Sequence, residues 1–123
     1  MTALSLHFKA SEFACRCCGK AEMDAEFIIA LERLRVQIAA PFIITSGYRC
    51  LAHNAAVGGA EKSAHTLGKA ADIAISGGNA SRVVSFAPRL GFTGIGIKQH
   101  GSFSGRYIHL DTAHSDFTVW TYS

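Results

Sequence analysis

The sequence predicts an α+β fold, a small single domain over residues 1–123 in which helices flank a mainly antiparallel sheet. The length of 123 residues suits one domain. Hydrophobic residues make up 49% of the chain, which is enough to form a core. Two helical segments precede separate runs of short strands, an order that is typical of α+β proteins.

The first 20 residues show no clear hydrophobic period, so we expect an irregular N-terminal arm anchored by Phe8 and Phe13. The chain contains four cysteines: Cys15, Cys17, Cys18 and Cys50. Three states suit them: a structural metal site with a fourth ligand from elsewhere, one disulfide to Cys50, or reduced thiols. Because Cys17 and Cys18 are adjacent, they cannot easily point at one metal ion together.

The first helix is predicted to begin after Asp24, a favourable N-cap residue, and to carry Glu26 in its first turn. Apolar residues then recur at helical spacing on one face: Phe27, Ile28, Leu31, Leu34 and Ile38. Since Pro41 cannot continue a helix, this helix should end near residue 39 or 40. We assign its apolar face to the core.

The middle of the chain combines four short segments. Residues 42–45 form a β-branched run that is typical of a buried strand, and residues 46–49 follow as a turn. Residues 51–57 favour a short helix, which a glycine pair ends. Residues 61–69 are mostly small and polar, which indicates a loop.

A second strand is predicted over residues 70–75, where alternation places Asp72 and Ile73 on opposite faces. A glycine pair then breaks the chain, and Asn79 or Ser81 is expected to cap the next helix. The remaining predicted segments are strands at 95–97, 107–111 and 119–122, with a turn at 100–105.

Three residues of this sequence form a candidate metal site: His65, Asp72 and His109. Two imidazoles and a carboxylate are good zinc ligands, and three protein ligands leave a position for the water of a catalytic site. A carboxylate inside the apolar run around Asp72 is costly unless it is paired or bound to metal. If strands 70–75 and 107–111 are neighbours, Asp72 and His109 line one cleft, and Gly68 lets the loop that carries His65 turn back.

The residues around this site have candidate roles in hydrolysis. Asp111 shares a strand face with His109, so it is our candidate general base, or else a carboxylate that orients His109. Arg49 could stabilise an oxyanion or serve as an ordinary salt-bridge partner, and Ser63 could bind substrate or a ligand. The other histidines have no motif around them and are expected at the surface: His7, His53, His100 and His114.

Together these residues resemble the zinc D-Ala-D-Ala carboxypeptidase family of the M15 type. The family's signature Ser-x-His-x-x-Gly-x-Ala-x-Asp is complete here: Ser63, His65, Gly68, Ala70 and Asp72. Further likeness lies in Ser-Gly-Tyr-Arg at 46–49, in Asn-x-x-Val-Gly-Gly at 54–59 and in His-x-Asp at 109–111. The likeness covers residues 8–120 and is close to the branch found in phage endolysins and bacterial murein endopeptidases.

The resemblance implies the small α+β fold shared with the hedgehog signalling domain. It also implies one Zn²⁺ held by His65, Asp72 and His109, and a substrate among D-residue-containing stem or cross-link peptides of peptidoglycan. Arg49 matches the family's arginine at the carbonyl oxygen, and Ser63 and Tyr48 are expected to contact substrate. Several relatives carry an acidic base three positions before the last ligand; here that residue is Arg106, so the role passes to Asp111.

The predicted function is therefore that of a zinc metallopeptidase acting on peptidoglycan peptides. Two alternatives are a non-catalytic zinc-containing module that binds the cell wall and a small cysteine-rich structural protein. We expect a monomer that contacts neither nucleic acid nor membrane, because the net charge of +3 is mild and no basic cluster or long apolar run occurs. Residues 1–10 lack the apolar stretch of a signal peptide, which predicts a protein that is cytoplasmic until released, or one encoded by a phage or prophage.

Overall fold

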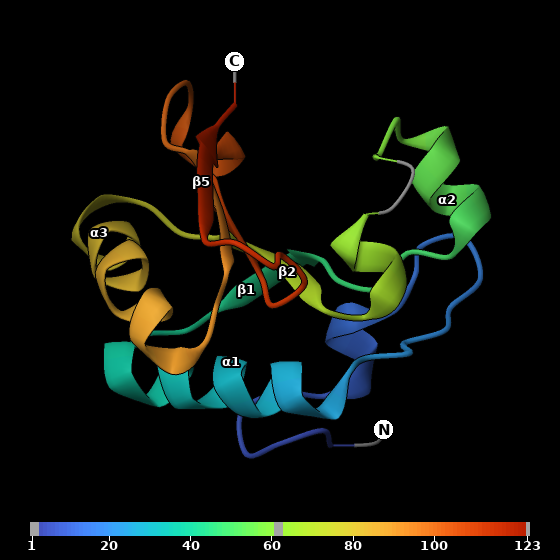
Figure 1. The fold of residues 1–123 in the computed structure, drawn as a ribbon, viewed down its shortest axis with the longest axis horizontal. Coiled ribbons are helices and arrows are strands. Elements are labelled where there is room, and N and C mark those ends of the chain that lie inside the picture. The colour runs from blue at the N-terminus through green and yellow to red at the C-terminus, as the bar shows by residue number, and fades with distance from the viewer. Residues whose placement is uncertain (1–2, 61–62, 123) are drawn as a thin grey trace.

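A five-stranded sheet in the order β1-β2-β4-β3-β5 forms the centre of the computed structural model, which describes residues 3–60 and 63–122 (Figure 1). The strands are β1 (Ile43–Ser46), β2 (Ala70–Ala74), β3 (Gly94–Lys98), β4 (Tyr107–Asp111) and β5 (Thr118–Thr121). β3 and β5 pair in parallel, and every other pair is antiparallel. The predicted α+β fold with a mainly antiparallel sheet is confirmed.

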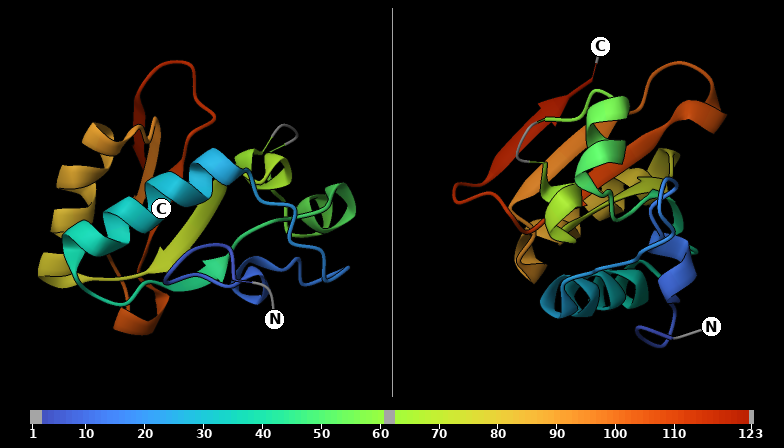
Figure 2. Two further views of the ribbon diagram at one scale, coloured as in Figure 1. Left: turned by 90° about the horizontal axis from the view of Figure 1, so that it is seen from below. Right: turned by 90° about the vertical axis from the view of Figure 1, so that its right-hand side faces the viewer.

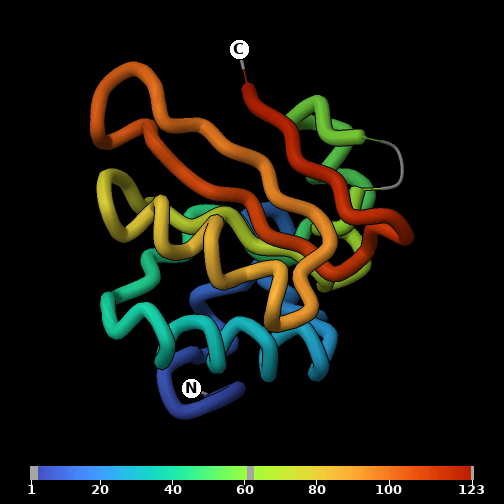
Figure 3. The backbone as a smooth tube through the Cα atoms, turned by 60° about the vertical axis from the view of Figure 1, so that its left-hand side comes forward, coloured from blue at the N-terminus to red at the C-terminus, as the bar shows by residue number. Residues whose placement is uncertain are grey.

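Helices lie on both faces of this sheet. The α-helices are α1 (Ala25–Ile38), α2 (Leu51–Ala56) and α3 (Gly77–Phe86). Short 3₁₀ helices are η1 (Ala10–Phe13), η2 (Ala64–Leu67), η3 (Ala87–Leu90) and η4 (Phe103–Gly105). α1 and α3 contact each other and lie on the same side of the sheet, whereas α2 and η2 lie on the opposite side (Figure 2; Figure 3).

The core forms between α1, α3 and the sheet. The carboxylate of Asp24 accepts a hydrogen bond from the amide of Phe27 (3.0 Å), which confirms the predicted N-cap of α1. The apolar face of α1 meets Ile73 of β2 and Leu110 of β4 in one buried cluster. None of the helices in the described ranges has the length and apolar character needed to cross a membrane; α1, with 14 residues, is the longest.

The N-terminal arm is tied to the domain by aromatic packing. Phe8 and Phe13 are buried, and their ring centroids lie 5.7 Å apart, which confirms their predicted role as anchors. The carbonyl of Phe13 accepts a hydrogen bond from the amide of Tyr48 (2.9 Å), so the arm contacts the turn before α2. The arm is not wholly irregular, because η1 lies within it.

Three local predictions are wrong. β1 is not a buried strand: it lies at the sheet edge, paired with β2, and Ile43 is 63% exposed. α3 begins at Gly77 after Ser76 rather than at Asn79 or Ser81, since the glycines expected to break the chain form its first turn. The predicted loop at 61–69 contains η2; its residues 61 and 62 lie outside the described part of the chain.

Substitution of Gly68 tests whether the loop around it packs closely against Glu22. Gly68 has φ of +69°, and a β-carbon there would meet the carbonyl oxygen of Glu22, whereas Gly58 has φ of +72° with open space around it. We expect Gly58→Ala to destabilise the protein by about 1–2 kcal/mol from backbone strain alone. Gly68→Ala should cost about 1–3 kcal/mol more, because Glu22 must also move. Denaturant unfolding of the metal-stripped variants measures both; equal costs would contradict the close packing of Gly68 against Glu22.

Candidate metal centre

The register of the sheet places the predicted site residues in one row. Asp72 of β2 lies directly opposite His109 of β4, His109 lies opposite Gly96 of β3, and Gly96 lies opposite Trp120 of β5. Directly opposite residues project to the same side of a sheet. Because the neighbours of Asp72 and His109 in sequence are buried in the core with α1 and α3, the row faces the other side, where η2 lies.

Three potential ligand atoms lie close together on the face of the sheet that carries this row. Asp72 Oδ1 is 3.0 Å from His109 Nδ1 and 3.5 Å from His65 Nε2, and all three atoms lie within 4.8 Å of one another. His65 reaches the row from η2 and is buried, as is His109. This set of two imidazole nitrogens and one carboxylate oxygen fits one divalent metal ion such as zinc.

Hydrogen bonds orient both imidazoles toward this point. His65 Nδ1 donates to the carbonyl of Gly47 (2.8 Å), which leaves Nε2 free on the Asp72 side. His109 Nε2 donates to Asp111 Oδ2 (2.8 Å), which turns Nδ1 toward Asp72. Partners of this kind fix the tautomer and ring orientation of metal-binding histidines. Hydrogen bonds within the protein therefore fix the orientation of both candidate ligands, His65 and His109.

Asp111 is a buried carboxylate at the floor of the site. Besides the bond to His109, its Oδ1 accepts hydrogen bonds from the amide of Ala113 (3.0 Å) and from His114 Nδ1 (2.8 Å). Burial raises the pKa of Asp111, but these hydrogen bonds outweigh it and lower the pKa to about 2. A β-carbon at Gly94, opposite on β3, would collide with this carboxylate. Gly94 therefore leaves room for the Asp111 carboxylate, which accepts hydrogen bonds from the imidazoles of His109 and His114.

The carboxylates and imidazoles of the site shift one another's pKa values. Burial raises the pKa of Asp72, yet the hydrogen bonds and charges of His109 and His65 hold it well below its usual range. Burial lowers the pKa of His109, but Asp111 and Asp72 outweigh it and raise the pKa to about 8. A cation at this point, either a proton on His109 or a metal ion, is therefore stabilised by the surrounding charges.

The structure also brings Arg49 and Ser63 to the site. Arg49 Nη2 is 3.8 Å from Asp72 Oδ2, while Nε donates to Ser46 Oγ and Nη1 to Asn54 Oδ1 (both 3.3 Å). Ser63 Oγ accepts a hydrogen bond from the amide of His65 (3.2 Å). Tyr48 is the exception, since it lines a neighbouring pocket that shares Arg49 with the site.

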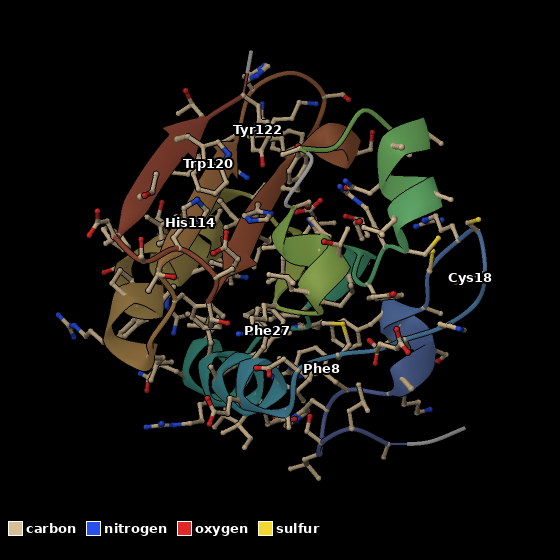
Figure 4. The ribbon with its side chains drawn as sticks, turned by 45° about the vertical axis from the view of Figure 1, so that its right-hand side comes forward. Phe8, Cys18, Phe27, His114, Trp120 and Tyr122 are labelled. Atoms are coloured by element: carbon tan, nitrogen blue, oxygen red, sulfur yellow. The ribbon has the colours of Figure 1, made fainter. Side chains whose placement is uncertain are left out.

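Aromatic residues that sequence reasoning missed form a wall of the cleft. The cleft of about 520 Å³ is lined by His65, Asp72 and His109 together with Tyr107, His114, Trp120 and Tyr122. Figure 4 shows His114, Trp120 and Tyr122 near one another. The Trp120 ring centroid is 5.1 Å from that of His109 and 5.3 Å from that of His114. The period-two spacing of Trp120 and Tyr122 was a usable signal, but the parallel pairing of β5 with β3 was not predicted.

Arg106 points away from the ligand atoms. Its Nε and Nη2 donate to the carbonyl of Gly101 (3.1 and 2.9 Å), and its guanidinium lies 4.3 Å from the centroid of the Phe103 ring. Arg106 lines a separate pocket beside α3. The arginine therefore neither blocks the cleft nor contributes a base to it.

The fold and the site define a small α+β protein with a candidate mononuclear metal centre of two histidines and one aspartate in an open cleft. The family model described as Peptidase M15 matches residues 6–111, and the chain belongs to this family. Membership implies a metal-dependent peptidase. A search of the curated proteins finds no match.

The His109 proton gives a pH test of this geometry. In metal-free protein we expect His109 to titrate at about 8 rather than at 6.5. Since the folded state holds the proton more tightly, its contribution to stability is fully present below pH 6.5 and is lost as the pH rises through about 8. NMR of the imidazole ring measures the midpoint, which Asp111→Asn should lower. A wild-type midpoint at or below 6.5 would contradict the pairing with Asp111.

Proposed function

We propose that this protein is a zinc metallopeptidase that hydrolyses D-residue-containing stem or cross-link peptides of peptidoglycan. The convergence of His65 Nε2, Asp72 Oδ1 and His109 Nδ1 in an open cleft carries the proposal. Two imidazoles and a carboxylate are a ligand set of catalytic zinc sites. The substrate class rests on the complete Ser-x-His-x-x-Gly-x-Ala-x-Asp motif and on membership in the M15 family.

Arg49 supplies positive charge beside the reacting centre. When bound, zinc would polarise a water molecule and the substrate carbonyl. The Arg49 guanidinium is 3.8 Å from Asp72 Oδ2 and 17% exposed, and its bonds to Ser46 and Asn54 fix its direction. A fixed cation in a sheltered cleft stabilises an oxygen that becomes negative in the transition state. We assign this role to Arg49.

We assign proton transfer to His114 and a positioning role to Asp111. Both oxygens of Asp111 already accept hydrogen bonds, and its low pKa makes it a weak proton acceptor. His114 lines the cleft and is held through Nδ1, so its Nε2 is the atom able to take a proton from water and return it to the leaving amine. The Asp111 carboxylate stabilises the imidazolium that forms.

Three aromatic side chains suit the binding of a peptide. Tyr107, Trp120 and Tyr122 line one side of the cleft and offer flat apolar surface with polar tips. Burial raises the pKa of Tyr122 to about 12, so its hydroxyl remains a hydrogen-bond donor at neutral pH. We propose that the wall formed by these three rings orients the substrate backbone across the ligand atoms.

The alternative is a non-catalytic, zinc-containing module that binds the cell wall. Its main support is Arg106, which stands where several relatives carry an acidic base. Since Arg106 bonds to Gly101 away from the cleft, the missing acid leaves the ligand atoms and the Asp111–His114 pair undisturbed. This arrangement supports the enzyme over the binding module.

Release of peptides from purified peptidoglycan tests the proposal. We expect His114→Gln to lower kcat by at least about 100-fold with zinc content unchanged, because the cleft loses its proton acceptor. His7→Gln, on the N-terminal arm, is the matched control and should keep full activity. Zinc content is measured on the same samples by elemental analysis.

The outcomes separate the three readings. If zinc-loaded His114→Gln keeps wild-type activity while zinc-loaded Asp111→Asn loses it, the carboxylate itself is the base and the assignment to His114 is wrong. If zinc-loaded wild-type protein binds peptidoglycan without cutting it, the protein is the binding module.

A further inference from the structure

Three cysteine sulfurs form a second cluster outside the cleft. The Sγ atoms of Cys15, Cys18 and Cys50 lie within 4.8 Å of one another, although the first two belong to the N-terminal arm and the third precedes α2. All three are free thiols. Cys15 is buried and Cys18 is exposed, and Figure 4 shows Cys18 on the arm beside the segment that leads into α2.

The backbone of the arm wraps around Cys15. The amide of Cys15 donates to the carbonyl of Lys20 (2.7 Å), and the amide of Gly19 donates back to the carbonyl of Cys15 (2.8 Å). This tight turn requires φ of +75° at Gly19, which glycine adopts without steric cost. The turn brings Cys18 back toward Cys15 at the Cys-x-x-Cys spacing that is typical of zinc sites.

Amide groups point at the sulfurs. The amide of Cys50 donates to Cys15 Sγ (3.4 Å), and the amide of His53 donates to Cys50 Sγ (3.4 Å). Such donors favour a thiolate over a thiol. Burial raises the pKa of Cys15, but the amides of Cys50, Cys18 and Cys17 outweigh it and lower the pKa to about 6.

We propose that Cys15, Cys18 and Cys50 bind a second zinc ion as thiolates. Those of the three thiols that still carry a proton release it to solvent when the ion binds. The exposed Cys17 contacts the thiol of Cys50 but is not in the group whose sulfurs all lie within 4.8 Å of one another, so it is not assigned as a ligand. The site is independent of the peptidase assignment, because it shares no ligand with His65, Asp72 and His109.

The second ion would fasten the arm to the turn that carries Arg49. Cys50 follows Arg49 directly, and the neighbouring Tyr48 already bonds to Phe13 of the arm. Arg49 in turn lies 3.8 Å from Asp72. The zinc ion would therefore hold Arg49 in place through Cys50, the next residue in the chain. It would not contact substrate.

Adjacent exposed cysteines provide a matched pair of variants. Full-length protein is prepared under reducing conditions with excess Zn²⁺ and dialysed, and zinc is counted per chain. We expect about two ions in the wild type and in Cys17→Ser, and about one in Cys18→Ser. With Co²⁺ in place of zinc, thiolate charge-transfer absorption should appear in the wild type, in Cys17→Ser and in His65→Ala, and disappear in Cys18→Ser. Circular dichroism confirms that each variant is folded.

Two results would overturn the proposal. Cys18→Ser that retains both zinc ions and the thiolate absorption of cobalt would remove Cys18 from the site. A disulfide that includes Cys15 or Cys50 in the protein as purified without reductant, found by mass spectrometry of its peptides, would show that these sulfurs are consumed by oxidation. Loss of peptidase activity in His65→Ala with retained thiolate absorption separates this site from the cleft.

Discussion

The candidate metal centre depends on the antiparallel pairing of β2 with β4, which sets Asp72 directly opposite His109. This register brings a carboxylate and an imidazole to the same face of the sheet, where burial makes each costly without the other. Asp111, two residues further along β4, accepts hydrogen bonds from both His109 and His114. A slip by one residue would turn these side chains into the apolar core, so the core on the opposite face secures the register of the site.

Much of the fold was predictable, because apolar spacing reports directly on burial. The period of α1, the cap at Asp24 and the alternation of β2 and β4 were all read correctly. The error at β1 arises because local patterns do not report position within a sheet. The β-branched run of β1 suggested a buried strand, whereas the fold places it at an edge where Ile43 is exposed.

The site was predictable where a short motif encodes it and unpredictable where a turn or a strand pairing brings residues together. The histidine and aspartate ligands come from two short motifs, and the strand period already put His109 and Asp111 on one face. His114 was expected at the surface and is exposed, but no pattern revealed that the turn after β4 brings it to 2.8 Å from Asp111. The aromatic wall depends on the parallel pairing of β5 with β3, and Gly96 leaves room for the Trp120 ring, since a β-carbon there would lie 2.7 Å from its Nε1.

Anomalous diffraction at the zinc absorption edge, on crystals grown with Zn²⁺, tests the central claim most directly. We expect an anomalous peak in the cleft about 2.0–2.2 Å from His65 Nε2, Asp72 Oδ1 and His109 Nδ1. That peak should vanish in His65→Ala crystals while any peak at the cysteines remains. A zinc peak confined to the cysteines, or none in the cleft of the wild-type protein, would contradict the account.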